Sequence, residues 1–383
     1  MPTSGRVAGA PRIAYVSIDS RMNFLRDALA ARGCDVVAIE GDDIDRLTRL
    51  VGAGVSLATP RMEWWIRYQM SWPVRWRRAK VAARRLPDAD ALDAIVFGGS
   101  WYTVDAYRPD GTRIPTFHYI DQSMSRTPLP GEQRGHGPFG RPGLRAQRAM
   151  YARAGRVLTM SEWARDHTRS EHVTLPADRV EAVGWGPCAV DLSNEPVSLA
   201  AKQPLVLLVA MDFYRKGVDY FSAVAKLVRA ERPQVRFVLV GADQSRSAIR
   251  VGDDVEYLGL VRDTQVLRSL FAHARVFLMP HRYDRAGHVL AEAMSAGTPV
   301  VTGIQGGPPE VPRRSRAGAA LPPDDVLALA AAVGHLLDDD VRWSAQSANA
   351  RACQAEYYSW DAVARRVCRS MATGGVPSMA ALG

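Results

Sequence analysis

The stretch Asp284 to Val301, DRAGHVLAEAMSAGTPVV, carries the most information about the fold of this 383-residue chain. Its residues predict a helix that begins at Gly287 and runs to Ser295. Gly297 then ends the helix, and Pro299 prevents its continuation. The apolar residues PVV follow directly. The stretch therefore predicts a helix that leads into a buried strand of an α/β sheet.

The start of this helix has the features of a diphosphate site. Glycine at the entrance lets a phosphate approach the backbone N–H groups of Gly287, His288 and Val289, at the positive end of the helix dipole. Glu292 lies one turn after His288 on the same helical face, where its carboxylate can accept both ribose hydroxyls of a nucleotide. An ordinary amphipathic helix with a glycine C-cap explains the same residues, so both interpretations stay open.

Outward from this stretch, short apolar strands alternate with amphipathic helical segments, as is typical of parallel α/β sheets. A first series runs from the strand Ile13 to Ser17 to a strand around Val180. The polar residues 193–204 contain a proline near either end and predict a linker. A second series of similar length begins with PLVLLVAM. We therefore expect two Rossmann-like halves.

The composition indicates a globular protein. Hydrophobic residues make up 47% and charged residues 23% of the chain, which excludes a disordered class. The longest apolar runs, such as Pro204 to Met211, are far shorter than the roughly 18 residues of a membrane-spanning helix. The first residues lack the apolar core of a secretory signal, so we expect a cytoplasmic protein. The four cysteines are far apart without a CxxC pair, which argues against a zinc site or a disulfide framework.

The chain is basic, with a net charge of +9 and a pI near 9.6. This balance suits phosphate-bearing ligands, anionic membrane surfaces or nucleic acid, and it does not choose among them. An arginine-rich genomic composition explains it as well.

Residues 61–85 combine tryptophans with arginines. This composition suits a bilayer interface, where the rings lie at headgroup level and the cations meet anionic lipid. It also suits stacking on single-stranded nucleic acid, or a helix whose tryptophans are core and whose arginines are solvated. The residues proposed for a membrane or acceptor surface are Trp64, Trp65, Arg67, Trp72, Arg75 and Trp76.

Several motifs, in order along the chain, match those of one enzyme family. Asp284 and Glu292 are separated by seven residues and followed by AMSAGTPVV. The same pattern includes RVLTMSEWARDH (156–167), RKG (215–217), VLVGA (238–242), YLGLV (257–261), GGPPEV (306–311) and YSWDAVARR (358–366). Ordered matches over roughly residues 150 to 370 are far more specific than a single glycine motif. The chain resembles the retaining glycosyltransferases of the GT-B fold often called family 4.

The resemblance implies a GT-B architecture, an α/β fold with two Rossmann-like domains facing across a cleft. The first expected domain, residues 1–195, binds the acceptor. The second, residues 196–357, binds the nucleotide sugar. Residues 358–383 are expected to form a helix that crosses back to the first domain and ends in a frayed tail.

The resemblance also implies roles in donor binding. Glu292 holds the ribose, and Asp284 faces the donor sugar. Lys216 neutralises the diphosphate together with the helix N-terminus at 287–289, and so stabilises the charge that develops on the leaving group. The backbone at Leu260 and Val261 lies near the base.

His118, in the segment TFH at the end of a strand, is similar to a histidine of lipid-acceptor mannosyltransferases in this family. There the histidine lies between acceptor and donor, where it can position or shuttle a proton. A structural histidine that caps a strand explains His118 equally.

Three positions depart from the family pattern. The first carboxylate is Asp284 where the family usually has glutamate, so the shorter arm changes which sugar hydroxyl it reaches. The family arginine five residues before Lys216 falls on Met211, and Arg215 is the candidate substitute if it points the same way as Lys216. The residues SIDSRMN (17–23) replace a glycine pair, so acceptor handling is unusual or catalysis is weakened.

The implied reaction is front-face transfer of a sugar from a nucleotide diphosphate to a hydroxyl acceptor, with retention of configuration. No metal or other cofactor is expected, because Lys216 and the helix dipole carry the charge. The expected partners are the nucleotide sugar, an acceptor of unidentified class and a peripheral membrane contact at the inner surface, with no nucleic acid.

Other classes fit part of the pattern. A nucleotide-sugar epimerase or hydrolase of the same architecture would convert the donor without an acceptor. A non-catalytic binding protein or partner subunit fits the departures at Asp284 and at residues 17–23. A nucleic-acid binder fits only the charge, because no base-reading motif is present.

Overall fold

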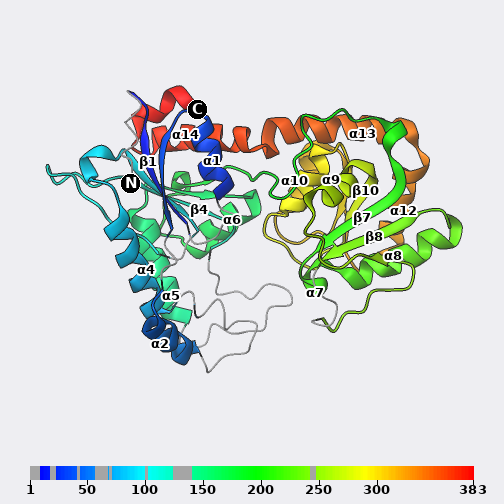
Figure 1. Ribbon diagram of the computed structural model, residues 1–383, viewed down its shortest axis with the longest axis horizontal. Helices are drawn as coiled ribbons and strands as arrows, with labels where there is room; N and C mark the ends of the chain where they lie inside the picture. The colour runs from blue at the N-terminus through cyan, green and yellow to red at the C-terminus, as the bar shows by residue number, and fades with distance from the viewer. Residues whose placement is uncertain are drawn as a thin grey trace. The chain divides into compact units, whose positions relative to one another are not determined.

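The computed structural model describes residues 9–17, 23–40, 44–56, 68, 71–99, 102–123, 140–241 and 247–383. These residues form two compact units. Unit 1 contains the described residues up to 183 together with 363–383, and unit 2 contains residues 184–362. Each unit has its own six-stranded sheet flanked by helices (Figure 1). The expected α/β class with two Rossmann-like units is confirmed, while the functional domain limits after 195 and 357 stay predictions.

Unit 1 has a parallel sheet with the strand order β2-β1-β3-β4-β5-β6. Strands β1, β3 and β4 are almost entirely buried, as expected for parallel strands covered on both faces. The strands are β1 (Arg12–Ser17), β2 (Asp35–Glu40), β3 (Ala94–Gly98), β4 (Thr116–Ile120), β5 (Arg156–Thr159) and β6 (Val180–Ala182). The helices are α1 (Asn23–Ala31), α2 (Arg46–Ser56), α4 (Trp72–Arg85), α5 (Gly140–Arg153) and α6 (Glu162–Glu171), with short turns η2 (Ala89–Ala91) and η3 (Ala177–Arg179).

Unit 2 has a second parallel sheet, with the strand order β12-β11-β10-β7-β8-β9. The strands are β7 (Gln203–Ala210), β8 (Arg236–Gly241), β9 (Glu256–Tyr257), β10 (Ala274–Met279), β11 (Val300–Thr302) and β12 (Gly318–Ala320). The helices are α7 (Phe213–Lys216), α8 (Val218–Glu231), α9 (Thr264–His273), α10 (His288–Ser295), α11 (Glu310–Ser315), α12 (Val326–Asp338) and α13 (Asp340–Cys353), with η4 (Leu199–Ala201) and η6 (Gln354–Tyr358). The predicted helix of the opening stretch is α10.

The strand order of unit 2 creates a topological switch point. The chain moves outward from β7 to β8 and β9, then returns to the other side of β7 with β10. Strands β7 and β10 pair in parallel, with Leu207 opposite Phe277. The loops that follow them lead away in opposite directions, and α/β sheets bind ligands at such a point, beyond the carboxyl ends of the strands. Residues 211–217 and 280–287 therefore occupy the expected ligand position of this unit.

Residues 193–204 do not link the two units, as the sequence predicted, because this segment is part of unit 2 and packs on it. The Leu192 N–H donates to Ser295 Oγ at 2.9 Å. The Lys202 ammonium donates to the Ala296 carbonyl and to Thr298 Oγ1, each at 2.9 Å. Its polar residues thus find partners on the helix end that precedes β11, and the segment belongs to the unit that it was expected only to join.

The predicted frayed tail is also wrong. Helix α14 (Trp360–Thr373) continues past Met371, and a further turn, η7 (Pro377–Leu382), follows it. Met379 of this turn is fully buried, and Arg32 Nε donates to the Leu382 carbonyl at 2.8 Å. Burial of an apolar side chain and a long-range hydrogen bond hold the tail on unit 1.

Candidate functional site

Lys216 lies at the centre of the switch point in unit 2. It is the last residue of α7, whose first turn is capped by Asp212, which accepts the Arg215 N–H at 3.0 Å. Gly217 ends α7 in the left-handed conformation, with a φ of 73°. The Lys216 side chain is buried, and its ammonium bonds to the Asp284 carboxylate and to Met279 Sδ at 3.3 Å.

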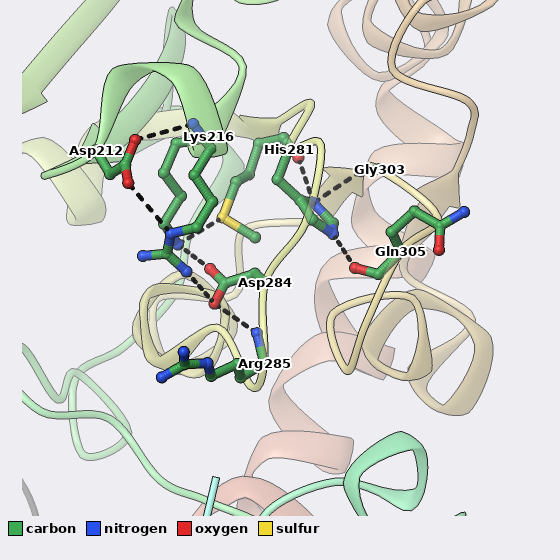
Figure 2. Close-up of polar contacts among 9 residues, drawn as sticks. Asp212, Lys216, His281, Asp284, Arg285, Gly303 and Gln305 are labelled. Atoms are coloured by element: carbon green, nitrogen blue, oxygen red, sulfur yellow. Dashed lines mark hydrogen bonds and ion pairs between the residues drawn. The ribbon is translucent and has the colours of Figure 1, made fainter. Parts of the chain in front are cut away.

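Figure 2 shows Lys216 and Asp284 at this site. Arg215 contacts the same Asp284 carboxylate as Lys216. Its Nη1 donates to Asp284 Oδ1 at 3.1 Å, and its Nε lies 3.6 Å from Asp212 Oδ2. The two neighbouring cations therefore converge, whereas Met211, at the family arginine position, is exposed. Arg215 thus points the same way as Lys216, and its role as a substitute for the family arginine in donor binding stays a prediction.

Asp284 is buried but ionised. Burial by itself raises the pKa of this carboxyl, yet the Lys216 ammonium and the Arg215 guanidinium outweigh burial and hold its pKa well below the ordinary value. Its Oδ1 also accepts the Arg285 N–H at 2.7 Å. Asp284 thus fixes both cations at the carboxyl edge of the sheet.

His281, which the sequence did not single out, positions the loop that carries Asp284. Its ring is buried, and burial lowers its pKa. Its Nδ1 lies 3.1 Å from the Gly303 nitrogen and 3.1 Å from the Met279 carbonyl oxygen, and its Nε2 lies 2.8 Å from the Gln305 carbonyl oxygen. These contacts tie the loop after β10 to the loop after β11 (Figure 2). In the sequence, the position of His281 between a strand and Asp284 was the only indication of this role.

Glu292 connects α10 to the chain that enters unit 2. Its Oε1 accepts the Cys188 N–H at 3.1 Å and the Ala189 N–H at 2.8 Å. Burial raises the pKa of Glu292, and the bonds from these backbone N–H groups counter part of that effect. The carboxylate therefore has a structural role that sequence did not predict. A carboxylate has about four lone-pair positions, so its contact with a ribose stays a prediction.

The N-terminus of α10 has the predicted glycine entrance. Gly287 is the N-cap residue, with a φ of 86°, and as a glycine it places no side chain at the helix entrance. The His288 ring is used elsewhere, since its Nδ1 lies 2.8 Å from the Gly186 carbonyl oxygen. The first backbone N–H groups of α10, those of His288 and Val289, are the candidate donors to a phosphate.

Leu260 and Val261, the residues expected near a base, follow β9 at the carboxyl edge of the same sheet. Leu260 is half exposed, so an apolar side chain faces solvent beyond the strand ends. In the part of the chain that the structure describes, no group of three or more His, Cys, Asp or Glu side chains is arranged to hold a metal ion. The expectation that none is needed stays a prediction.

His118 lies in the interior of unit 1, in the middle of β4, and has no exposed surface. Its ring stacks on Phe97 with centroids 5.0 Å apart, and its Nδ1 lies 3.4 Å from the Gly99 carbonyl oxygen. Burial lowers its pKa to about 4, so the ring is neutral at physiological pH. The catalytic assignment is therefore not supported by this structure, in which His118 is a core residue.

The tryptophan–arginine segment is helical where it is described. Trp64, Trp65 and Arg67 lie outside the described residues. Trp72 and Trp76 of α4 are exposed, while Arg78 is buried on the opposite side of the helix. The alternative with core tryptophans and solvated arginines is therefore wrong for these positions. Arg75 also departs from the predicted surface, because it is half-buried with Nη2 3.5 Å from Met150 Sδ.

No helix in the described ranges is both long enough and apolar enough to span a bilayer.

Two parallel six-stranded units, one with paired cations at its switch point, define an α/β protein of the GT-B type. Residues 203–339, from β7 to just past α12, match the family described as Glycosyl transferases group 1. Residues 203–339 thus belong to the group 1 glycosyltransferase family, and the chain as a whole has the GT-B fold.

Individual proteins agree with this assignment. The phosphatidylinositol N-acetylglucosaminyltransferase gpi3 subunit of Schizosaccharomyces pombe is 29% identical over 219 residues, which cover 55% of this chain and 47% of that protein. A GDP-mannose-dependent monoacylated alpha-(1-6)-phosphatidylinositol monomannoside mannosyltransferase of Corynebacterium glutamicum is 31% identical over 213 residues. These residues cover 52% of this chain and 55% of that protein. The chain thus spans about half the length of these curated relatives.

A solved structure described as trehalose-6-phosphate from E. coli bound with UDP-2-fluoro glucose has the same fold. Its TM-score is 0.68 at 12% identity, and the match covers 95% of this chain and 99% of that chain.

Proposed function

We propose that this protein is a retaining glycosyltransferase whose unit 2 binds a nucleotide-diphosphate sugar at the β7–β10 switch point. The observation that carries the proposal is the convergence of Lys216 and Arg215 on Asp284 next to the N-terminus of α10, which begins at Gly287. Two cations and a helix N-terminus together suit a diphosphate, which carries charge on two phosphorus centres.

The cation pair is neutralised within the protein by Asp284 and Asp212. A diphosphate therefore competes with these carboxylates for Lys216 and Arg215. This arrangement favours a ligand that brings more than one negative charge, because a single charge gains little over the carboxylate already present. The cluster thus favours diphosphate over neutral sugars or monoanions.

In the proposed reaction, the bond between the anomeric carbon and the diphosphate oxygen breaks, and the electron pair leaves with the diphosphate. Lys216 and Arg215 stabilise the charge that develops on that oxygen. The acceptor hydroxyl attacks the anomeric carbon from the same face, and its proton passes to the departing phosphate oxygen. Asp284 faces the sugar and orients its hydroxyls, and Glu292 binds the ribose.

For the acceptor we propose a hydroxyl group on a membrane-associated molecule, reached by peripheral contact with the cytoplasmic face of the inner membrane. The exposed tryptophans and cations of α4 support this choice. Two relatives named for phosphatidylinositol-based substrates are consistent with it. The name of the first relative, a subunit, motivates the second candidate function, a partner subunit of a larger transferase.

The test is a panel of UDP, GDP, dTDP and ADP sugars, incubated with the protein without acceptor. Melting temperature reports binding, and slow release of free nucleotide reports cleavage of the donor. We expect one nucleotide series to raise the melting temperature with slow release. Lys216→Met should weaken that binding or cleavage by about 10²–10³-fold, the usual effect of removing one charge-stabilising donor. The control is Lys226→Met, an exposed lysine on α8.

The outcomes separate the candidate functions. Binding without release of nucleotide favours the partner subunit. Interconversion of the donor without an acceptor favours an epimerase. A folded protein that responds to no nucleotide sugar contradicts the proposed donor site, as does equal sensitivity of the two lysine variants.

A further inference from the structure

A cavity of about 220 Å³ lies in unit 1, where the end of α5 meets the segment between α6 and β6. Arg148 and Tyr151 of α5 form part of its wall. His172, Thr174 and Arg179, from the segment before β6, form another part. The described wall contains no aspartate or glutamate, so the two arginines make the cavity positively charged.

The cavity lies at the amino edge of the sheet of unit 1. Helix α5 leads directly into the start of β5, and residues 172–179 lead into the start of β6. The ligand sites of parallel α/β sheets normally lie at the other edge, beyond the carboxyl ends of the strands. The cavity is therefore separate from a substrate site at the carboxyl edge, and the proposed donor site belongs to unit 2.

The two arginines of the wall are held in place by backbone carbonyl groups. Arg148 Nη2 donates to the Glu171 carbonyl at 3.3 Å, and Arg179 Nη1 donates to the Ala154 carbonyl at 2.9 Å. A guanidinium has five N–H donors, so each arginine keeps further donors for a ligand. Both side chains are half-buried, and among the described residues neither forms an ion pair with a carboxylate.

Other arginines of unit 1 do have such a carboxylate. Arg113 and Arg153, for example, both pair with Asp105, each at 2.8 Å. Arg148 and Arg179 are thus two positioned cations that share a cavity without a neutralising anion. A ligand that brings negative charge would gain from both of them.

The turn η3, which ends at the second of these arginines, is itself fixed. Arg169 Nη2 donates to the Ala177 carbonyl at 2.6 Å and to the Val180 carbonyl at 2.8 Å. Arg156 donates to the carbonyl of Asp178 between them. Because these bonds order the turn before any ligand arrives, binding there costs less conformational entropy.

His172 adds no charge to the cavity at physiological pH. Its ring is buried, and its Nε2 lies 3.3 Å from Gln147 Oε1. Burial and then the Arg148 guanidinium lower its pKa to about 4. The positive charge of the wall therefore comes from the two guanidinium groups, while Leu175 and Pro176 add apolar surface.

We propose that this cavity binds a small phosphate monoester. Two guanidinium groups match the several oxygens and the double negative charge of a phosphate better than those of a single carboxylate. The apolar part of the wall suits a short carbon chain. The volume is below the roughly 300–1,000 Å³ of pockets that enclose drug-sized ligands, which decides against a nucleotide sugar. The inference does not depend on the proposed function.

Calorimetric titration of the full chain with glycerol 3-phosphate tests the cavity, with sodium chloride holding the ionic strength constant. Inorganic phosphate probes the anion alone, and glycerol probes the carbon chain alone. We expect glycerol 3-phosphate to bind one to one and glycerol not to bind. Arg148→Gln and Arg179→Gln should each lower the affinity by about tenfold or more, because each removes charge-assisted hydrogen bonds.

A substitution at an exposed position tests the cavity without removing a bond of the fold. Thr174 is exposed, so its replacement leaves the core intact. Thr174→Glu places a carboxylate in the wall, where it competes for the arginines, and should lower the affinity by about tenfold or more. Thr174→Gln has a similar size without the charge and should bind almost as the wild type does.

Two further variants locate the binding. Arg145→Gln removes an exposed arginine from the same helix, α5, and should keep wild-type affinity. Lys216→Met should also keep it, because Lys216 belongs to the proposed donor site of unit 2. Loss of glycerol 3-phosphate binding in Lys216→Met would place the ligand at that site and overturn the inference. This control separates the cavity from the donor site, whose own test uses nucleotide sugars.

Three other results would also contradict the cavity as a phosphate site. The first is a folded wild-type protein that binds neither glycerol 3-phosphate nor inorganic phosphate. The second is equal loss of affinity in Arg145→Gln and Arg148→Gln, which would indicate general charge attraction. The third is stronger binding of dihexanoyl phosphatidic acid than of glycerol 3-phosphate, which would indicate a lipid headgroup instead of a small soluble ester.

Discussion

At the scale of single residues, Glu292 serves two purposes that a substitution can separate. In the structure it accepts two backbone N–H groups, those of Cys188 and Ala189, through Oε1. In the proposed function it also holds the ribose of the donor. A glutamine keeps a carbonyl oxygen for the N–H groups but loses the negative charge and gains two N–H donors. An alanine removes both functions.

We expect Glu292→Ala to destabilise unit 2 by about 1–3 kcal/mol, because two part-buried backbone N–H groups lose their charged acceptor. Glu292→Gln should cost about 1 kcal/mol or less, while it still weakens nucleotide-sugar binding by about tenfold or more. Urea unfolding and nucleotide titration measure the two effects. Wild-type nucleotide affinity in Glu292→Gln would show that the residue is structural only.

At the scale of elements, the loops after β10 and β11 hold Asp284 in place through close backbone contact. Asp284 and Gly306 form a parallel β-bridge, and the Gly307 N–H donates to the Asp284 carbonyl at 3.1 Å. Gly306 has a φ of 95°, and a Cβ atom there would lie only 1.6 Å from the Asp284 carbonyl oxygen. Only glycine fits this position, because both its φ and its space exclude a side chain.

Gly306→Ala should therefore destabilise unit 2 by about 3 kcal/mol or more, since the two loops must separate. Gly259→Ala is the control, because Gly259 has a φ of 66° but nothing within 4 Å of an added Cβ atom. Strain alone should cost it about 1 kcal/mol. Equal losses for the two variants, measured by urea unfolding, would mean that the contact with Asp284 is unimportant.

At the scale of the whole molecule, the core of unit 1 contains two buried histidines. His118 and His172 are almost completely inaccessible, and burial lowers the pKa of each to about 4. The His172 Nε2 lies 3.3 Å from Gln147 Oε1. Both rings are neutral in the folded unit but bind protons readily once it unfolds, so the stability of unit 1 depends on pH.

The lowered pKa values of the two histidines determine the direction in which stability changes with pH. Each histidine contributes its full stability above the unfolded pKa of 6.5, and this contribution is lost as the pH falls from 6.5 towards 4. The loss approaches ~3 kcal/mol for each ring. His118→Leu should flatten the decline in melting temperature between these pH values, whereas His335→Gln, at an exposed position, should not. An unchanged slope in His118→Leu would contradict the assignment of His118 to the core.

The sequence by itself determined the order of elements and the family. Strand and helix periodicity, the helix from Gly287 to Ser295 and its glycine and proline end all depend on residues within a few positions of one another. Local pattern could therefore predict α10 and the two Rossmann-like units.

The tertiary structure decided which groups meet. Glu292 accepts hydrogen bonds from N–H groups about a hundred residues earlier in the chain. Lys216, at the end of α7, contacts Asp284 in the loop after β10. Burial of His118 and exposure of Trp72 depend on which helices cover each face. No local pattern contains these facts, because hydrogen bonding and burial depend on distances that only the folded chain brings within a few ångströms.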